Sequence, residues 1–218
     1  MNLQKKYTIS FQPTSVQITE PVTKFGGQPV WIAEPEWPIS KAIGEPMRFI
    51  CQVFLYPEIF GDIVGQMAYI FMTDGEDYVD GTWEPEGGEN AVIVQPNGEN
   101  VATKSLATGP SLYQMTKQEG AKLLQPVPCE FSVEVKLEDD PERGFEDDTD
   151  EIDYTEVKIG GTPIFLQGEE YPEGDNWRLL LQLDSASVPF YVNFGDAGIG
   201  YAFVSVAGHK GKFLWQCA

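Results

Sequence analysis

Two aspartates stand at matching places in this chain and could do chemistry together. Asp62 ends the sequence Phe60-Gly61-Asp62, and Asp196 ends the sequence Phe194-Gly195-Asp196. Two carboxylates brought together near an axis can bind a cation or share a proton. The alternative is that each aspartate hydrogen-bonds the backbone of its own turn, as aspartates in turns commonly do.

Four aromatic residues occupy corresponding positions and are the second candidate. Trp31 and Trp37 correspond to Phe165 and Tyr171 at a shift of 134 residues. If two halves pack about a pseudo-twofold axis, these rings and the two aspartates are candidates to line a binding site at the seam between the halves. The alternative is that the rings fill the core, which is the more frequent role of large aromatic side chains.

Other reactive residues form no recognisable catalytic or metal-binding set. His209 is the only histidine and lies in Gly208-His209-Lys210-Gly211, which we expect to be a turn between two strands. No Gly-x-Ser-x-Gly elbow, phosphate loop or dinucleotide fingerprint is present. The stretch 147–150 carries acids but lacks the glycine of an EF-hand loop. The three cysteines form no CxxC pair: Cys51, Cys129 and Cys217. We therefore assign no catalytic residue, no metal and no cofactor.

The elements that must position these residues are two copies of one strand-rich unit. Each copy opens with Gly-Gly-X-Pro followed by apolar and aromatic residues, at 26–31 and 160–165. Paired glycines allow positive φ, and we expect each proline to begin a strand. Further on, Arg48 and Gln52 match Arg178 and Gln182 at a shift of 130. A glutamine in an apolar strand either ties the strand to a loop or presents its amide to a bound peptide.

Short apolar runs bounded by glycine, proline, aspartate and asparagine predict a mainly β fold with few helices, and a β-rich α+β fold is the alternative. We expect a first β-rich repeat over 1–110, a helical connection over 111–128 and a second repeat over 129–218, packed as one compact unit. Residues 138–156 hold eleven acids and one arginine. Such a segment repels itself, so we expect a loop there.

The charge balance restricts the classes of partner. Thirty-four acids against fourteen bases give a formal net charge of −20, which repels nucleic acid and anionic membrane surfaces and attracts a basic protein. The chain begins without a signal peptide and holds no long apolar run, so we expect a cytoplasmic protein. The oligomeric state is not predicted.

Both halves carry motifs that are shared with a known family. They are Gly26-Gly27-Gln28-Pro29, Trp37-Pro38, Phe49-Ile50-Cys51-Gln52, Leu180-Leu181-Gln182-Leu183-Asp184-Ser185, Phe194-Gly195-Asp196-Ala197-Gly198-Ile199-Gly200-Tyr201 and Trp215-Gln216-Cys217. These motifs resemble those of the bacterial YwqG-like family of unknown function. More distantly, the Gly-Gly-X-Pro-X-Trp and Leu-Leu-Gln elements look like those of the programmed-cell-death-protein-two family, which assists a ribosomal protein during assembly. No catalytic residues are established for the YwqG-like family, so the resemblance assigns none here, and an immunity or regulatory role is compatible with it.

Two function hypotheses follow. The first is a non-enzymatic module that binds a protein or peptide, such as an acidic immunity or escort protein for a basic partner. The second is a small-ligand binder or hydrolase-like enzyme at the seam between the repeats. The duplicated frame, the acidic charge and the lack of a nucleophile favour the first hypothesis.

Overall fold

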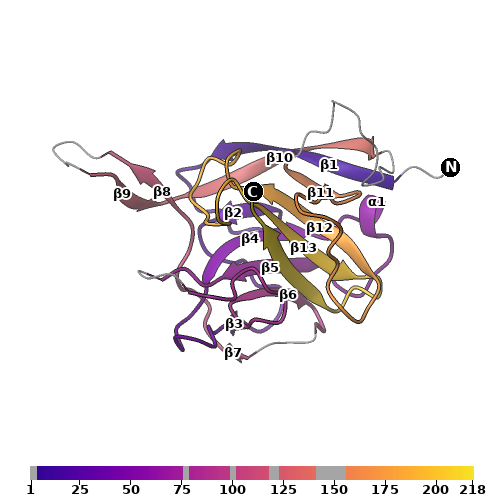
Figure 1. Ribbon diagram of the computed structural model, residues 1–218, viewed down its shortest axis with the longest axis horizontal. Coiled ribbons are helices and arrows are strands. Elements are labelled where there is room, and N and C mark those ends of the chain that lie inside the picture. Colours follow the sequence, from indigo (N-terminus) through magenta and orange to yellow (C-terminus); the bar gives the residue numbers. More distant parts are fainter. Residues whose placement is uncertain (1–3, 76–78, 99–101, 118–122, 141–155) are drawn as a thin grey trace.

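A computed structural model describes residues 4–75, 79–98, 102–117, 123–140 and 156–218 (Figure 1). Within these ranges the chain forms fourteen strands and a single four-residue helix, α1 (Pro57–Phe60). The strands are β1 (Gln4–Pro13), β2 (Lys24–Gly26), β3 (Trp37–Pro38), β4 (Arg48–Phe54), β5 (Met67–Met72), β6 (Asn90–Gln95), β7 (Thr103–Lys104), β8 (Tyr113–Thr116), β9 (Gln125–Pro128), β10 (Glu130–Asp140), β11 (Lys158–Gly160), β12 (Trp177–Asp184), β13 (Ile199–Ser205) and β14 (Gly211–Gln216). The predicted mainly β class is confirmed.

Ten strands form one antiparallel sheet that curls into a nearly closed barrel. Its order is β14-β13-β12-β11-β1-β10-β2-β4-β5-β6. The two outermost strands, β14 and β6, contact each other, so the sheet almost closes on itself. Strands from both predicted repeats therefore share one sheet.

The first strand of each predicted repeat lies beside the other repeat. β1 pairs with β10 along its whole length and with β11 at one end, whereas β10 pairs with β2. Parts of both long strands alternate more and less buried residues, as is typical of strands with one exposed face. Each half of the sheet is thus completed by a strand from the other half (Figure 1).

Corresponding residues of the two halves make the same contacts. Oε1 of Gln52 accepts a hydrogen bond from the Val30 N–H at 2.8 Å, and Oε1 of Gln182 accepts one from the Ile164 N–H at 2.9 Å. Both glutamines are fully buried, and each ties its strand to the segment after a Gly-Gly turn. The β4–β5 and β12–β13 pairs also carry bulges at corresponding positions. The duplication itself stays a prediction.

Three apolar clusters hold the fold together. The largest lies inside the curled sheet and draws on strands of both halves, including Phe25 from β2 and Ile159 from β11. Because side chains alternate across a strand, the remaining buried residues face outward. They form one outer cluster on the first half and another on the second, which the irregular segments after the Gly-Gly turns cover.

The paired glycines end strands instead of leading into new ones. Gly26, Gly27, Gly160 and Gly161 all have positive φ, between 63° and 74°, as predicted. However, the residues after each pair, including Pro29, form no strand. The expectation that the proline begins a strand is wrong, because the chain leaves the sheet here to cover its outer face.

The connection between the halves is a hairpin. The described parts of 111–128 contain β8 and β9, which pair antiparallel, so the helical prediction for this stretch is wrong. Figure 1 shows this hairpin projecting from the body of the molecule. We call it the β8–β9 arm.

The acidic stretch 138–156 begins within the sheet, because β10 continues to Asp140. The rest of the expected loop, 141–155, lies outside the described residues, and so does the acidic stretch 147–150. Across the described ranges, no helix is long and apolar enough to cross a membrane.

Candidate binding sites

The predicted aromatic residues form two separate pairs. The rings of Trp31 and Trp37 lie 6.3 Å apart in the outer cluster of the first half. The rings of Phe165 and Tyr171 lie 5.3 Å apart, and Phe165 belongs to the outer cluster of the second half. Trp37 is fully buried and donates from Nε1 to the Met47 carbonyl at 2.8 Å. Tyr171 also contacts Phe203 of that cluster. All four rings therefore pack in or against outer clusters, and the pairs lie on different halves of the sheet.

The two predicted aspartates are exposed. Asp62 lies in the loop after α1, and Asp196 lies in the turn before β13. The backbone carbonyl of Asp196 accepts a hydrogen bond from the Ala218 N–H at 3.1 Å. Because both side chains face solvent, these aspartates do not form a sheltered acid–base pair.

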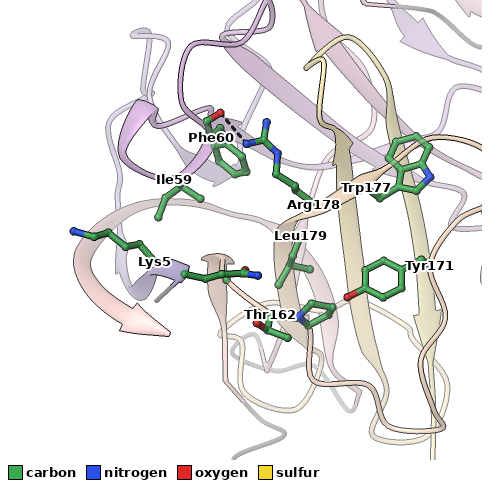
Figure 2. Close-up of a pocket in the computed structure, with 11 residues that line it drawn as sticks. Lys5, Ile59, Phe60, Thr162, Tyr171, Trp177, Arg178 and Leu179 are labelled. Carbon is green, nitrogen blue, oxygen red and sulfur yellow. Dashed lines mark hydrogen bonds between the residues drawn. The ribbon is translucent and has the colours of Figure 1, made fainter. Parts of the chain in front are cut away.

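A cavity does lie between the halves, at one end of the sheet. Its volume is about 240 Å³, and Figure 2 shows its lining. The first half contributes Lys5 from β1 and Phe60 from α1, while the second half contributes Thr162, Trp177 and Arg178. Of the six predicted site residues, only Tyr171 lines it. We call this the seam cavity.

Arg178 is the more buried of the two positively charged residues that line the seam cavity. It has no carboxylate partner among the described residues. Its Nη1 donates to the Phe60 carbonyl at 2.9 Å, drawn as a dashed line in Figure 2, and its Nη2 donates to the Val206 carbonyl at 3.2 Å. The guanidinium also lies over the Phe60 ring, 5.7 Å from its centroid. Burial lowers the pKa of Arg178, because desolvation disfavours the charged form.

A second cavity, of about 690 Å³, lies at the base of the β8–β9 arm. We call it the arm cavity. Its arginine is Arg48, whose Nε lies 2.6 Å from Oδ2 of Asp74 and whose Nη1 donates to the Ser111 carbonyl at 2.7 Å. The guanidinium lies over the Tyr113 ring at 4.6 Å. Met115 from the arm also lines this cavity.

A buried network of two lysines and two acids lies against the turn at Gly161, next to the seam cavity. Nζ of Lys6 lies 3.3 Å from Asp140, and Nζ of Lys158 lies 3.6 Å from Asp140 and 3.3 Å from Glu156. Lys6 also contacts Glu156. Desolvation lowers the pKa of Lys158 despite both acids. Desolvation acts on Lys6 in the same direction, but Glu156 and Asp140 outweigh it, so the pKa of Lys6 is raised. Since these charges satisfy one another, the network acts as structural support for the turn at Gly161.

The remaining reactive residues are not arranged as a catalytic set. His209 lies in a turn between β13 and β14, as predicted, and its backbone N–H donates to Oγ of Ser205. The three cysteines are free, and burial raises the pKa of Cys129 to about 11. Within the described ranges, no three histidine, cysteine or acidic side chains gather as metal ligands.

Arg178 is one of two matching arginines in the sequence, but no sequence pattern assigns it to a site. The chain holds only three arginines, and two of them occupy the matching positions 48 and 178. Their scarcity in a strongly acidic chain is a signal that could have identified them. Thr162 and Lys5 offered no comparable signal.

The fold and cavities define a class of protein: a strand-rich chain whose ten-stranded sheet is nearly closed, with cavities at the seam and beside a projecting hairpin. The chain belongs to the family described as "Domain of unknown function (DUF1963)", which matches residues 67–210. A comparison with curated proteins found no match.

Proposed function

We propose that this protein is a non-enzymatic module that binds a basic protein partner through the β8–β9 arm and the arm cavity. The observation that carries the proposal is the exposure of apolar side chains on a projecting hairpin. Met115, Leu123 and Leu124 are 42%, 74% and 53% exposed. Clustered exposed apolar side chains commonly mark interaction surfaces.

A partner would contact the side chains of the β8–β9 arm and would not pair with its backbone as an added strand. Pro126 and Pro128 lie in β9 and lack N–H groups, so β9 is a poor template for an added strand. The base of the arm is held in place, because Tyr113 stacks on Tyr191 at 5.3 Å and the Gln114 amide donates to the Pro189 carbonyl at 2.6 Å. A fixed base reduces the ordering entropy that binding costs.

The charge of the chain supports a basic partner. A net charge of −20 raises the rate of encounter with an oppositely charged protein, while apolar contacts at the arm would give the complex its lifetime. An escort or immunity protein needs this combination.

The test compares two double variants as affinity baits in a lysate of the native host. The arm variant is Met115→Ser with Leu124→Ser, and the control is Val16→Ser with Val64→Ser, which removes two exposed valines elsewhere. Excess lysozyme in the lysate competes with proteins that bind through charge alone. We expect the wild type and the control to retain one basic protein, which the arm variant loses.

The salt dependence gives a second readout. The retained protein should elute at about 0.5 M salt, where the Debye length falls to about 4 Å. Equal retention by the arm variant and the control refutes the role of the arm. If lysozyme displaces everything that binds, the proposal of a specific partner is wrong.

A further inference from the structure

Unpartnered polar atoms of the described residues gather beside two of the cavities. Within the described ranges, four buried side-chain atoms have no hydrogen-bond partner: Nε of Arg48, Oγ of Ser111, Oγ1 of Thr162 and Nε of Arg178. The first two residues line the arm cavity and the last two line the seam cavity. Buried polar atoms without partners are uncommon in folded proteins and call for a local explanation.

The matching arginine in the first half shows what Arg178 lacks. Arg48 pairs across the sheet with Met72, and Asp74 follows two residues later. Arg178 pairs with Val204, and the residue two positions later is Val206. The Asp74 carboxylate therefore lies beside Nε of Arg48 and forms an ion pair with it, although the two groups are not aligned as a hydrogen bond. The residue at the corresponding position beside Arg178 is Val206, which has no carboxylate.

The same contrast holds at Thr162, which corresponds to Gln28. The Gln28 amide donates to the Gly109 carbonyl at 3.1 Å and accepts from the Gly109 N–H at 2.9 Å, so both of its polar atoms are satisfied. Oγ1 of Thr162 is buried without a partner. In both comparisons the first half places a protein group beside the polar side chain, a carboxylate at Arg48 and a backbone amide at Gln28, where the second half has none.

We propose that the seam cavity binds a small organic carboxylate, whose oxygens take hydrogen bonds from Arg178 and Thr162. The carboxylate occupies the place that Asp74 holds beside Arg48 in the other half. Lys5 at the rim adds a second positive charge, and Phe60, Tyr171 and Trp177 provide apolar and aromatic walls for the rest of the ligand. A volume of about 240 Å³ restricts the ligand to a small molecule, because sites for drug-sized ligands begin near 300 Å³.

Carboxylate is favoured over larger anions by the shape and chemistry of the site. Arg178 Nε and the Thr162 hydroxyl are two donors without partners on the wall of one cavity, which suits a ligand with as few acceptors as a carboxylate. Phosphate brings more charge and more acceptors, and it usually meets several backbone N–H groups or several cations. This site is independent of the β8–β9 arm, so either proposal can fail alone.

The test follows the side-chain Nε–H signals of the arginines by NMR in a carboxylate-free buffer. The probes are acetate, benzoate and phenylacetate, with their neutral amides and inorganic phosphate as controls. Each is added to about 20 mM, where a ligand with a millimolar dissociation constant is mostly bound. We expect a saturable shift of the Arg178 signal with a carboxylate, little change of the Arg48 signal and no shift with the matching amide.

Two variants give the residue roles. Arg178→Gln should weaken the binding of the same carboxylate by about 10- to 100-fold, the worth of one charge-assisted hydrogen-bonded pair, while Arg48→Gln leaves it unchanged. Thr162→Val, which keeps the shape of the side chain, should weaken it by about 2- to 10-fold. If Arg178→Gln fails to fold, the wild-type arginine signals and the Thr162→Val variant still test whether a carboxylate binds in the seam cavity.

Three results would overturn the proposal. The first is that no carboxylate in the set shifts the Arg178 signal. The second is that benzamide binds as tightly as benzoate, because the carboxylate then contributes nothing. The third is that phosphate binds more tightly than every carboxylate, which assigns the cavity to another class of anion.

Discussion

Replacing Gly26 by alanine tests how closely the end of β2 approaches the neighbouring strand. Gly26 has a φ of +69°, and a Cβ there would lie closer than 3.0 Å to the carbonyl oxygen of Cys129. The obstacle is backbone, so no side-chain rotation relieves it. Gly44 has a similar φ of +73° but faces open space, which makes Gly44→Ala the matched control.

The two substitutions share one cost and differ in another. A left-handed backbone costs an alanine about 1 to 2 kcal/mol at either position. Only Gly26→Ala adds the clash, and forcing extra atoms into a packed site costs about 1 to 3 kcal/mol. Gly26→Ala should therefore be less stable than Gly44→Ala by about 1 to 3 kcal/mol, or on the order of 2 to 10 °C in melting temperature for a chain of this size.

Urea denaturation followed by tryptophan fluorescence measures both variants. We expect the midpoint for Gly26→Ala to fall below that of Gly44→Ala at an unchanged slope, because the loss then lies in stability and not in the extent of unfolding. Equal midpoints would show that β2 and the segment at Cys129 can move apart at no cost, and the reasoning about close approach would be refuted.

Three further predictions concern buried polar groups. Lys24→Met should cost about 3 kcal/mol and more than Lys158→Met in urea denaturation. Glu130 then loses the one ion-pair partner that it has among the described residues, whereas the acids beside Lys158 keep Lys6. Cys129 in the native protein should react with iodoacetamide at pH 8 about 100-fold more slowly than in the denatured chain, since burial raises its pKa from 9.0 to about 11 and the thiolate is the nucleophile. The same shift stabilises the fold fully below pH 9, and this contribution is lost as the pH rises towards 11, so equal alkylation rates in both states would contradict it. Gln52→Leu should cost about 2 to 4 kcal/mol by calorimetry, because it leaves a backbone N–H and a carbonyl without partners.

The strands could be predicted because their sequences are short, apolar and bounded by turn residues. The β8–β9 arm could not, because its apolar residues are spaced as on a helix. Leu112 is fully buried, whereas Met115, Leu123 and Leu124 are exposed. Their helical spacing therefore reflects no common buried face. The prolines of β9 were the contrary signal, since proline disfavours a helix interior.

The site was harder to predict because it depends on which face of the sheet each segment covers. Matching sequence positions related Trp31 to Phe165 and Trp37 to Tyr171, but the curled sheet places the rings of the two halves at separate outer clusters. Predicting a role for Arg178 requires the strand pairing as well. Its missing carboxylate becomes visible only when the pairing of β12 with β13, including the bulge, is known.

The exchange of first strands between the halves has a consequence for synthesis of the chain on the ribosome. Both sheet partners of β1, β10 and β11, are made only after residue 129. At about 5 to 20 residues per second, β1 waits on the order of 10 s for its first neighbour. During that time β2 also presents an uncovered edge, which is open to pairing with other chains. Until the second half emerges, the first half therefore carries two strands whose edges still lack the neighbours that they have in the native sheet.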